Sequence, residues 1–366
     1  MFEKIQTPAI IIDESKMRNN IKRMLAVKEK YGVNLRPHFK THKSSLIAQE
    51  QLVAGADGIT VASVSEAELL LQKGVTDILV AYPLVDIEKV KRLKPYLHNA
   101  RVIFAIDSQA QAIRMNEAAS ELDVGFEVWI KINSGLNRCG VEPGKDALAL
   151  AEYITSLSGL QLTGLYTHAG HSYAATSKKQ KEAVTEQEVA SILQSAELCE
   201  QQGIKITNRS VGSTPTFERA ASYHGITEVR PGNAVFFDRM QIGLDVAEQQ
   251  EVAITILTQL ISIKKNRLIF DGGSKAFTTE KGAHGNEGVD GFGESIDHPE
   301  LILTRLSEEH GIVDLTEQNK IIHLGDKLRF IPNHACTAVN LFDHYIVLKE
   351  SGQLEKVPID GRGKSQ

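Results

Sequence analysis

Eight short apolar stretches, separated by segments with helical spacing, restrict the fold of this chain more than any other feature. They lie near residues 33–36, 58–62, 77–81, 101–106, 126–132, 160–166, 208–211 and 228–236. Helical patterns such as 65–73 and 108–121 stand between them. Strands that alternate with helices form parallel sheets, and eight such units close into a barrel. The sequence therefore predicts an α/β fold, a (β/α)8 barrel of the TIM type.

The last third of the chain has a different pattern. From about residue 251, β-branched runs are separated by Gly, Asp and Asn, which is typical of strands and turns. The runs are Val252–Ile263, Arg267–Phe270, Ile321–His323, Leu328–Ile331 and Asp343–Val347. We predict a barrel over residues 13–245 and a mostly β domain formed by residues 1–12 and 246–366. The glycine-rich stretch 282–293 is predicted to be a long loop over the site.

Charge and cysteine content exclude several classes of protein. The net charge is −5 and the basic residues are scattered, so no nucleic-acid partner is expected. The N-terminus has no apolar signal core and no apolar run reaches about 18 residues, so we expect no membrane span and a cytoplasmic location. The three cysteines, Cys139, Cys199 and Cys336, are irregularly spaced and do not indicate a disulfide framework.

A cluster of basic residues follows the first predicted barrel strand. It reads Arg36-Pro37-His38-Phe39-Lys40-Thr41-His42-Lys43. Function sits at the carboxyl ends of barrel strands, and a lysine crowded by like charges has a lowered pKa. A neutral amine is able to attack an aldehyde. We therefore predict that Lys40 is a reactive amine, against the alternative of a solvated basic turn.

Two small-residue turns follow the seventh and eighth predicted strands. They contain Gly212, Ser213 and Thr214, and then Gly232 and Asn233. Turns at these places often bind phosphate through backbone N–H groups and hydroxyls. A phosphorylated aldehyde held against a lysine amine indicates pyridoxal 5'-phosphate. Arg138, after the fifth strand, is a candidate to bind the ring oxygen or a substrate carboxylate, and otherwise a surface arginine.

Near the end of the chain, His334 and Cys336 stand two residues apart in Pro332-Asn333-His334-Ala335-Cys336. On an extended segment such residues face the same way and are able to bind one ion. Imidazole and thiolate suit zinc better than magnesium or calcium, with manganese as the other candidate. The plain alternative is a packed cysteine beside a polar neighbour. Two protein ligands leave coordination positions open for substrate and water.

Three motifs together resemble the D-threonine aldolase and D-serine dehydratase family. They are the basic cluster Arg36–Lys43, the segment Val229-Arg230-Pro231-Gly232-Asn233 and the segment Pro332-Asn333-His334-Ala335-Cys336. Members of this family are alanine-racemase-like, fold type III pyridoxal-phosphate enzymes. The resemblance implies that Lys40 carries the cofactor as a Schiff base and that His334 and Cys336 bind a divalent metal. It also implies a phosphate cradle at residues 212–214, 232 and 233, a ring or substrate lining from Arg138 and Tyr173, and a homodimer.

The resemblance predicts a lyase that acts on D-amino acids with a β-hydroxyl group. In dehydration, Lys40 would remove the α-proton; in aldol cleavage, a base such as His168 would take the hydroxyl proton. The aldolase branch has aspartate where this chain has Cys336, which favours dehydration. One alternative is a racemase with Tyr345 as its second acid–base group, and another is a protein that binds the cofactor without catalysis. The substrate side chain stays open.

Overall fold

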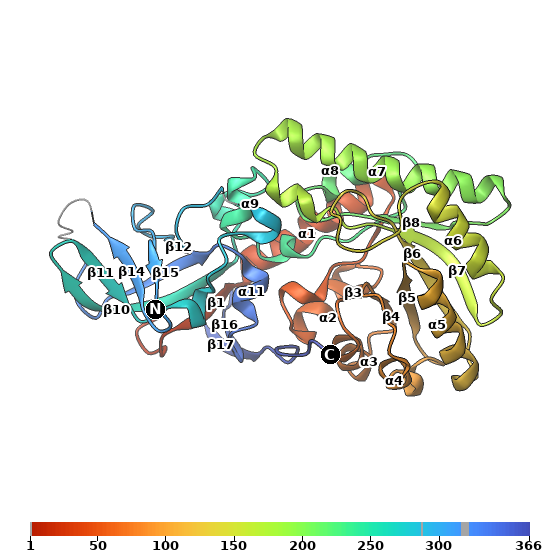
Figure 1. The fold of residues 1–366 in the computed structure, drawn as a ribbon. Helices are drawn as coiled ribbons and strands as arrows, with labels where there is room; N and C mark the ends of the chain where they lie inside the picture. The colour runs from red at the N-terminus through yellow and green to blue at the C-terminus, as the bar shows by residue number, and fades with distance from the viewer. Residues whose placement is uncertain (1, 287, 316–321) are drawn as a thin grey trace.

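The computed structural model describes residues 2–286, 288–315 and 322–366. In the part that carries most of the helices, eight parallel strands form one sheet in the order β2-β9-β8-β7-β6-β5-β4-β3 (Figure 1). The strands are β2 (Asn34–Leu35), β3 (Ile59–Val61), β4 (Asp77–Val80), β5 (Arg101–Ile106), β6 (Phe126–Lys131), β7 (Leu160–Tyr166), β8 (Asn208–Val211) and β9 (Glu228–Val229). All eight lie where the apolar runs predict them.

The two edge strands of this sheet, β2 and β3, meet at a residue that lies just beyond the end of β2. His38 forms a parallel bridge with Thr60, and the Thr60 N–H donates to the Pro37 carbonyl at 2.8 Å. The bridge closes the curved sheet on itself, as the predicted barrel requires. Apolar side chains such as Val61, Phe104 and Ile130 are fully buried beneath the surrounding helices.

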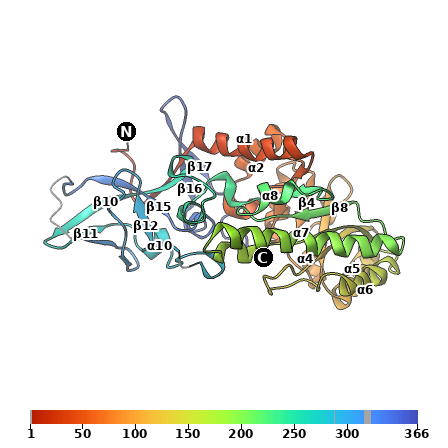
Figure 2. The same ribbon diagram turned by 90° about the horizontal axis from the view of Figure 1, so that it is seen from above.

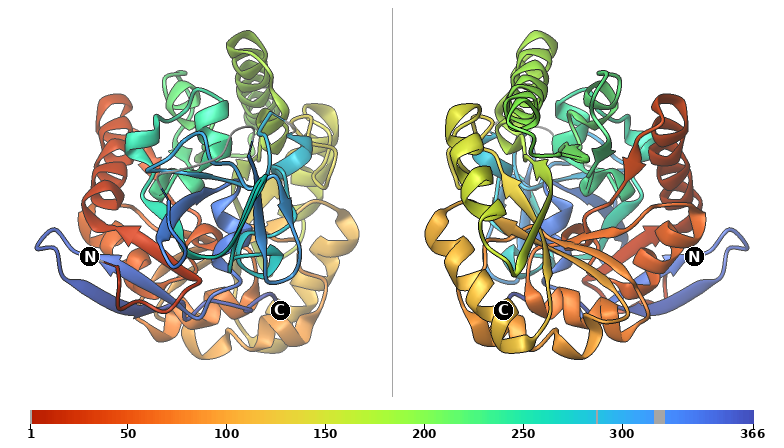
Figure 3. Two further views of the ribbon diagram at one scale, coloured as in Figure 1. Left: turned by 90° about the vertical axis from the view of Figure 1, so that its left-hand side faces the viewer. Right: turned by 90° about the vertical axis from the view of Figure 1, so that its right-hand side faces the viewer.

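Helices cover the outside of this sheet (Figure 3). They are α1 (Glu14–Tyr31), α2 (Ser45–Ala54), α3 (Val64–Gln72), α4 (Ile87–Lys91), α5 (Gln109–Leu122), α6 (Lys145–Thr155), α7 (Lys178–Gln201), α8 (Phe217–Ala221) and α9 (Arg239–Gly243). Short 3-10 turns connect several elements: η1 (Phe39–Thr41), η2 (Lys94–Tyr96), η3 (Gly170–Ala174), η4 (Asn233–Val235), η5 (Gln249–Glu251) and η6 (Ala283–Gly285). The Asp13 carboxylate caps α1, because it accepts the Lys16 N–H at 3.1 Å.

A nine-stranded sheet lies beside the barrel (Figure 2). Its strands are β1 (Ala9–Asp13), β10 (Ile254–Lys264), β11 (Arg267–Phe270), β12 (Gly293–Ser295), β13 (Arg305–Leu306), β14 (Gly311–Asp314), β15 (Lys327–Pro332), β16 (His344–Leu348) and β17 (Leu354–Pro358). Two short helices, α10 (Ser274–Phe277) and α11 (Ala335–Val339), belong to the same part. The N-terminal strand β1 lies inside this sheet, antiparallel to β10 and parallel to β16.

The strand predictions for this part are correct for four of the five runs. The prediction of a strand at 321–323 is wrong, because Ile322 and His323 form no strand. Ile321 lies outside the described residues. Within the described residues, no helix combines the length and apolar character needed to cross a lipid bilayer.

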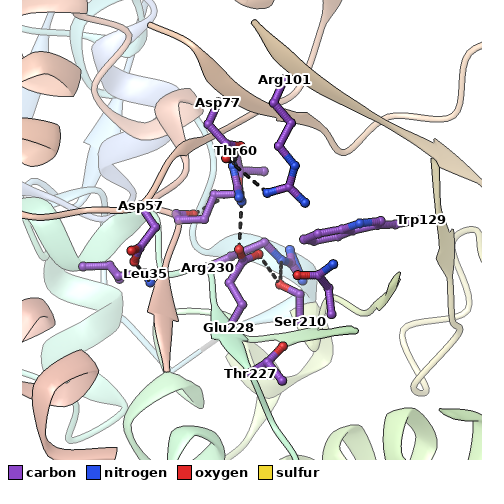
Figure 4. A network of polar contacts seen from close by, with 12 residues as sticks. Leu35, Asp57, Thr60, Asp77, Arg101, Trp129, Ser210, Thr227, Glu228 and Arg230 are labelled. Carbon is purple, nitrogen blue, oxygen red and sulfur yellow. Dashed lines mark hydrogen bonds and ion pairs between the residues drawn. The ribbon is translucent and has the colours of Figure 1, made fainter. Parts of the chain in front are cut away.

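A network of charged groups lies inside the barrel (Figure 4). The fully buried Arg36 forms ion pairs with Asp77 and, at 2.9 Å, with Glu228. Ser210 donates to Glu228 at 2.7 Å and accepts from Arg230 Nε at 2.8 Å. The network therefore ties β2, β4, β8 and β9 together. It also corrects one expectation, because Arg36 is neutralised inside the barrel and does not crowd Lys40.

Candidate active site

One cavity of about 190 Å³ lies at the carboxyl ends of the barrel strands. The barrel contributes Lys40, Arg138, His168 and Tyr173 to its lining. The turns after β8 and β9 contribute Ser213, Thr214, Gly232 and Asn233, and the segment after β15 contributes His334 and Cys336. Of the residues predicted to bind the cofactor or the metal, Gly212 alone does not line this cavity; it directly precedes Ser213, which does.

Lys40 lies in η1 and is half-buried beside this cavity. Burial lowers the pKa of its amine, and the nearby Arg138 and Lys131 lower it further, while the Cys336 thiolate opposes them. The direction agrees with the sequence-based expectation, but the responsible cations differ. Lys43 is paired with Glu66 at 2.6 Å, and Arg36 is held inside the barrel. Lys131, which was not predicted from the sequence, is one of the two cations that lower the pKa of Lys40.

The wall formed by the two turns offers free donors. The backbone N–H groups of Thr214, Gly232 and Asn233 have no acceptor among the residues that the structure describes. A side chain at position 232 would place its Cβ 3.1 Å from Thr41 Oγ1 and 3.2 Å from His38 Cβ, so glycine keeps this wall open. Three unpaired N–H groups beside a cavity match the needs of a phosphate group. The residues present therefore fit the phosphate of pyridoxal phosphate.

The predicted metal pair is in contact, although its backbone is not extended. His334 is the N-cap of α11 and Cys336 lies in the first turn of that helix. This corrects the prediction of a shared strand face. His334 Nδ1 lies 2.9 Å from Glu280 Oε2, so Nε2 is left for Cys336 and for an ion. Cys336 Sγ also lies 3.1 Å from Thr41 Oγ1.

Each side chain of this pair favours the charged form of the other. Burial alone would lower the pKa of His334, but the Cys336 thiolate and the Glu280 carboxylate raise it to about 10. Burial would raise the pKa of the Cys336 thiol, yet His334 and Lys40 bring it below its usual value. A thiolate beside an imidazole is the donor set of a zinc-type site. The pair fits a divalent metal, but no third His, Cys, Asp or Glu completes a metal cluster within the described residues.

Two histidines face each other at the cavity. The His168 and His284 ring centroids are 5.8 Å apart. Burial lowers the pKa of both rings, to about 4 for His284, so each ring is neutral near pH 7. Space for both comes from Gly170, where a Cβ would lie 2.9 Å from His284 Nε2 and 3.1 Å from His168 Nε2. His284 was missed as a residue, although the glycine-rich loop that carries it was predicted.

Tyr345, the candidate second acid–base group of a racemase, does not line the cavity. It is fully buried and its hydroxyl donates to the His42 carbonyl. A hydroxyl fixed in this way is not available to move a substrate proton from the opposite face.

Known proteins resemble this chain over nearly its whole length. The model of the alanine racemase N-terminal domain matches residues 12–240, and that of a serine dehydratase domain matches residues 253–348. A D-threo-3-hydroxyaspartate dehydratase of Delftia sp. (strain HT23) is 35% identical over 365 residues, which cover 96% of each chain. A D-serine dehydratase of Dictyostelium discoideum is 27% identical over 379 residues, again with 96% coverage of each chain.

Solved structures agree with the sequence matches. The Delftia dehydratase superposes with a TM-score of 0.90 at 34% identity and covers 98% of each chain. A D-threonine aldolase of Filomicrobium marinum superposes with a TM-score of 0.91 at 25% identity, over 99% of this chain and 97% of that one. Two more similar structures are variants of a D-threo-3-hydroxyaspartate dehydratase. In one variant a histidine is replaced by alanine. In the other, a cysteine two positions after that histidine is replaced by alanine, and this structure is described as metal-free.

A D-threonine aldolase of Arthrobacter sp. is also 28% identical over 99% of this chain, and it and the two dehydratases named above are lyases. This chain is therefore an enzyme of the lyase class, and the alternative of a non-catalytic cofactor-binding protein is set aside. Its barrel, its second sheet and its matches to both domain models agree. The chain belongs to the alanine-racemase-like, fold type III family of pyridoxal-phosphate enzymes.

Proposed function

We propose that this lyase dehydrates D-amino acids that carry a β-hydroxyl group, with pyridoxal phosphate and a divalent metal as cofactors. One observation carries the proposal. Lys40 and the His334–Cys336 pair line the same cavity, so a proton acceptor and a metal site meet at one substrate position. Cysteine rather than aspartate beside the metal histidine favours dehydration over aldol cleavage. The products would be a keto acid and ammonia.

Lys40 is the residue proposed to hold and move the α-proton. Bound pyridoxal phosphate would supply an electron sink for the negative charge that develops at the α-carbon. The lowered pKa of Lys40 favours the neutral amine, which is the form that accepts a proton. Arg138 lies at the mouth of the cavity with no acidic partner among the described residues, and is proposed to bind the substrate carboxylate.

His334 and Cys336 are proposed to hold the metal, with zinc preferred over manganese. The ion would act as a Lewis acid toward the β-hydroxyl. Glu280 fixes the orientation of the His334 ring through Nδ1, and Thr41 contacts the Cys336 sulfur. A similar dehydratase supports this assignment. It has a histidine and a cysteine two positions apart, and its variant with the cysteine replaced by alanine is described as metal-free.

Aldol cleavage is the second candidate, because His168 offers a suitable base. Burial lowers the pKa of this ring, and its Nε2 atom is buried without a hydrogen-bond partner among the described residues. A neutral, unpaired imidazole beside the cavity is able to take the proton of a β-hydroxyl. The racemase alternative has no comparable support, since Tyr345 faces away from the cavity.

The extent of the two domains is part of the same proposal. A barrel of residues 13–245 and a β domain of residues 1–12 and 246–366 agree with the pairing of β1 to β10 and β16. The homodimer and the cytoplasmic location stay predictions. Gel filtration with light scattering would test the first of these, and fractionation of cells the second.

An assay of products tests the proposed reaction. The metal-loaded holoenzyme would be incubated with D-serine, D-threonine and D-threo-3-hydroxyaspartate, each with and without a chelator. Keto acid and ammonia in the untreated samples alone would support dehydration. Glycine and an aldehyde would support aldol cleavage, and the L-enantiomer would support the racemase. Absence of all these products for every substrate would contradict the proposal.

A further inference from the structure

Glu188, in the middle of α7, is a fully buried carboxylate with an unusual set of partners. No described Lys, Arg or His forms a direct ion pair with it, although its charge acts to raise the pKa of the buried Arg230. The partners of Glu188 are three neutral donors: the Gly212 N–H at 2.9 Å, the Thr167 hydroxyl at 2.7 Å and the Thr216 hydroxyl at 3.0 Å. A buried carboxylate is costly, so three donors aimed at one indicate a function beyond filling space.

Each of the three donors belongs to a segment that shapes the cavity. Gly212 has a φ of 117° and directly precedes Ser213 and Thr214 in the phosphate wall. Thr216 closes the same turn, because its hydroxyl oxygen accepts the Ser213 N–H at 3.2 Å. Thr167 directly precedes His168 at the end of β7. One carboxylate therefore fixes the phosphate wall and the position of His168 together.

The charge of Glu188 does not help to bind the cofactor. A phosphate dianion in the cradle would be repelled by a carboxylate behind the same turn. Its hydrogen bonds offer a geometric benefit instead, since the bond from the Gly212 N–H fixes a residue with a φ of 117° and the nearby Thr214 N–H stays free. We propose that Glu188 is a positioning residue that sets the phosphate cradle for pyridoxal phosphate without touching it. This proposal rests on the family membership and not on which lyase reaction follows.

The test compares two cofactor forms that differ only in the phosphate. The affinity of the apoenzyme for pyridoxal phosphate and for pyridoxal would be measured from the absorbance of the Lys40 adduct. For Glu188→Ala we expect the pyridoxal phosphate affinity to fall about tenfold or more, because the cradle turn loses two hydrogen bonds, from Gly212 and Thr216, and Thr167 loses a third. The affinity for pyridoxal should change less than twofold. A general loss of structure would instead weaken both ligands.

Glu188→Gln is the conservative variant that separates geometry from charge. Its amide oxygen can accept hydrogen bonds from Gly212 and Thr167, and its amide N–H can donate to the Thr216 hydroxyl. The Thr216 hydroxyl can then donate to Ser213, whose Oγ and carbonyl oxygen lie 3.1 and 3.5 Å away. We expect this variant to bind pyridoxal phosphate at least as well as the parent enzyme. Glu186, on the exposed side of the same helix and paired with Arg219 at 2.8 Å, supplies the matched control Glu186→Ala, which should change neither affinity.

Three results would overturn the proposal. They are equal losses for both ligands in Glu188→Ala, no loss for either, and a loss in Glu188→Gln as large as that in Glu188→Ala. If Glu188→Ala does not fold, Thr216→Val removes one of the three links and should lower the affinity for pyridoxal phosphate alone. The measurement needs no turnover, so an inactive enzyme that binds as expected would contradict the proposed reaction and leave this assignment in place.

Discussion

Lys40 combines two properties that a proton-transfer residue needs, a lowered pKa and access to a cavity. Burial is the largest cause of the lowered pKa, and Arg138 and Lys131 add to it. A lysine fully exposed to water would remain protonated near pH 7. The surroundings of Lys40 thus favour the neutral amine.

Replacement of Lys40 by alanine tests this role. We expect Lys40→Ala to lose the absorbance band of the bound cofactor and to lose activity by about a thousandfold or more, because both the attachment point and the base are removed. Lys275→Ala is the control, since Lys275 is exposed and paired only with Glu309 at 2.5 Å. A Lys40→Ala protein that still showed the same absorbance band would contradict the assignment.

Cys336 is the residue at which metal binding is tested most directly. We expect Cys336→Ala to retain less than about a tenth of the bound metal, because His334 alone is a weak ligand for a divalent ion. Metal content after dialysis, measured by mass spectrometry, is the readout. Cys199→Ala serves as the control, because Cys199 is buried in α7 away from the cavity. Equal metal content in the two variants would contradict the proposed site.

Local signals explain which residues were predictable. Lys40, His334, Cys336 and the two turns carry chemistry that shows in a few neighbouring letters of the sequence. Glu280 and Glu188 do not, because each acts through a contact with a distant segment. Glu280 meets His334 from 54 residues away, and Glu188 meets Gly212 from 24 residues away. Only the fold brings such pairs together.

At the level of secondary-structure elements, one carboxylate connects the cofactor wall to the metal pair. Asp238 caps α9 by accepting the Gln241 N–H at 3.1 Å. Its other oxygen accepts the Ala335 N–H at 2.8 Å and a hydrogen bond from the Asn233 side chain. The turn η4 and the helix α11 therefore keep a fixed relation. The barrel strands were predictable because each lies within an apolar run, whereas β13 has a single apolar residue, Leu306, between polar neighbours.

The network inside the barrel makes Gly58 indispensable for packing. A Cβ at this position would lie 2.1 Å from Arg36 Nη1 and 2.9 Å from the Asp77 carbonyl. We expect Gly58→Ala to lower the free energy of unfolding by about 2–3 kcal/mol, because the buried Arg36 must move away from its partners. Gly125→Ala is the matched control, since no atom lies within 4 Å of its Cβ position. Urea unfolding of both variants is the measurement, and equal midpoints would contradict the prediction.

On the scale of the whole molecule, the site exists only because two sheets meet. The barrel supplies Lys40 and the phosphate wall, while the segment after β15 supplies His334 and Cys336 (Figure 1). The sequence predicts both parts but contains no signal for how they pack against each other. The loop with His284 shows the consequence, because its sequence indicates a loop and only its position makes it part of the site.

Burial of neutral histidines should make the stability of the apoenzyme depend on pH. Burial lowers the pKa of His42 to about 3 and brings that of His38 well below its usual value. In the unfolded chain both titrate near 6.5. The two rings of the unfolded chain are each about half protonated at pH 6.5 and almost fully protonated at pH 5, so in this window the unfolded chain gains about one proton in all that the native state does not bind. The free energy of unfolding should fall by up to about 1.4 kcal/mol per pH unit for each histidine.

Two other groups with shifted pKa values, His334 and Glu127, make contributions that change outside this window. His334 has a raised pKa, so its stabilising contribution is fully present below pH 6.5 and is lost only as the pH rises toward 10. Glu127 has a lowered pKa, so its contribution is lost only below about pH 4.5. Urea unfolding at pH 7.5, 6.5, 5.5 and 5.0 is the measurement. His42→Asn should remove part of the slope, whereas His98→Asn, at an exposed position, should leave it intact. A free energy of unfolding that stayed constant from pH 6.5 to 5.0 would show that these histidines take up protons in the folded protein.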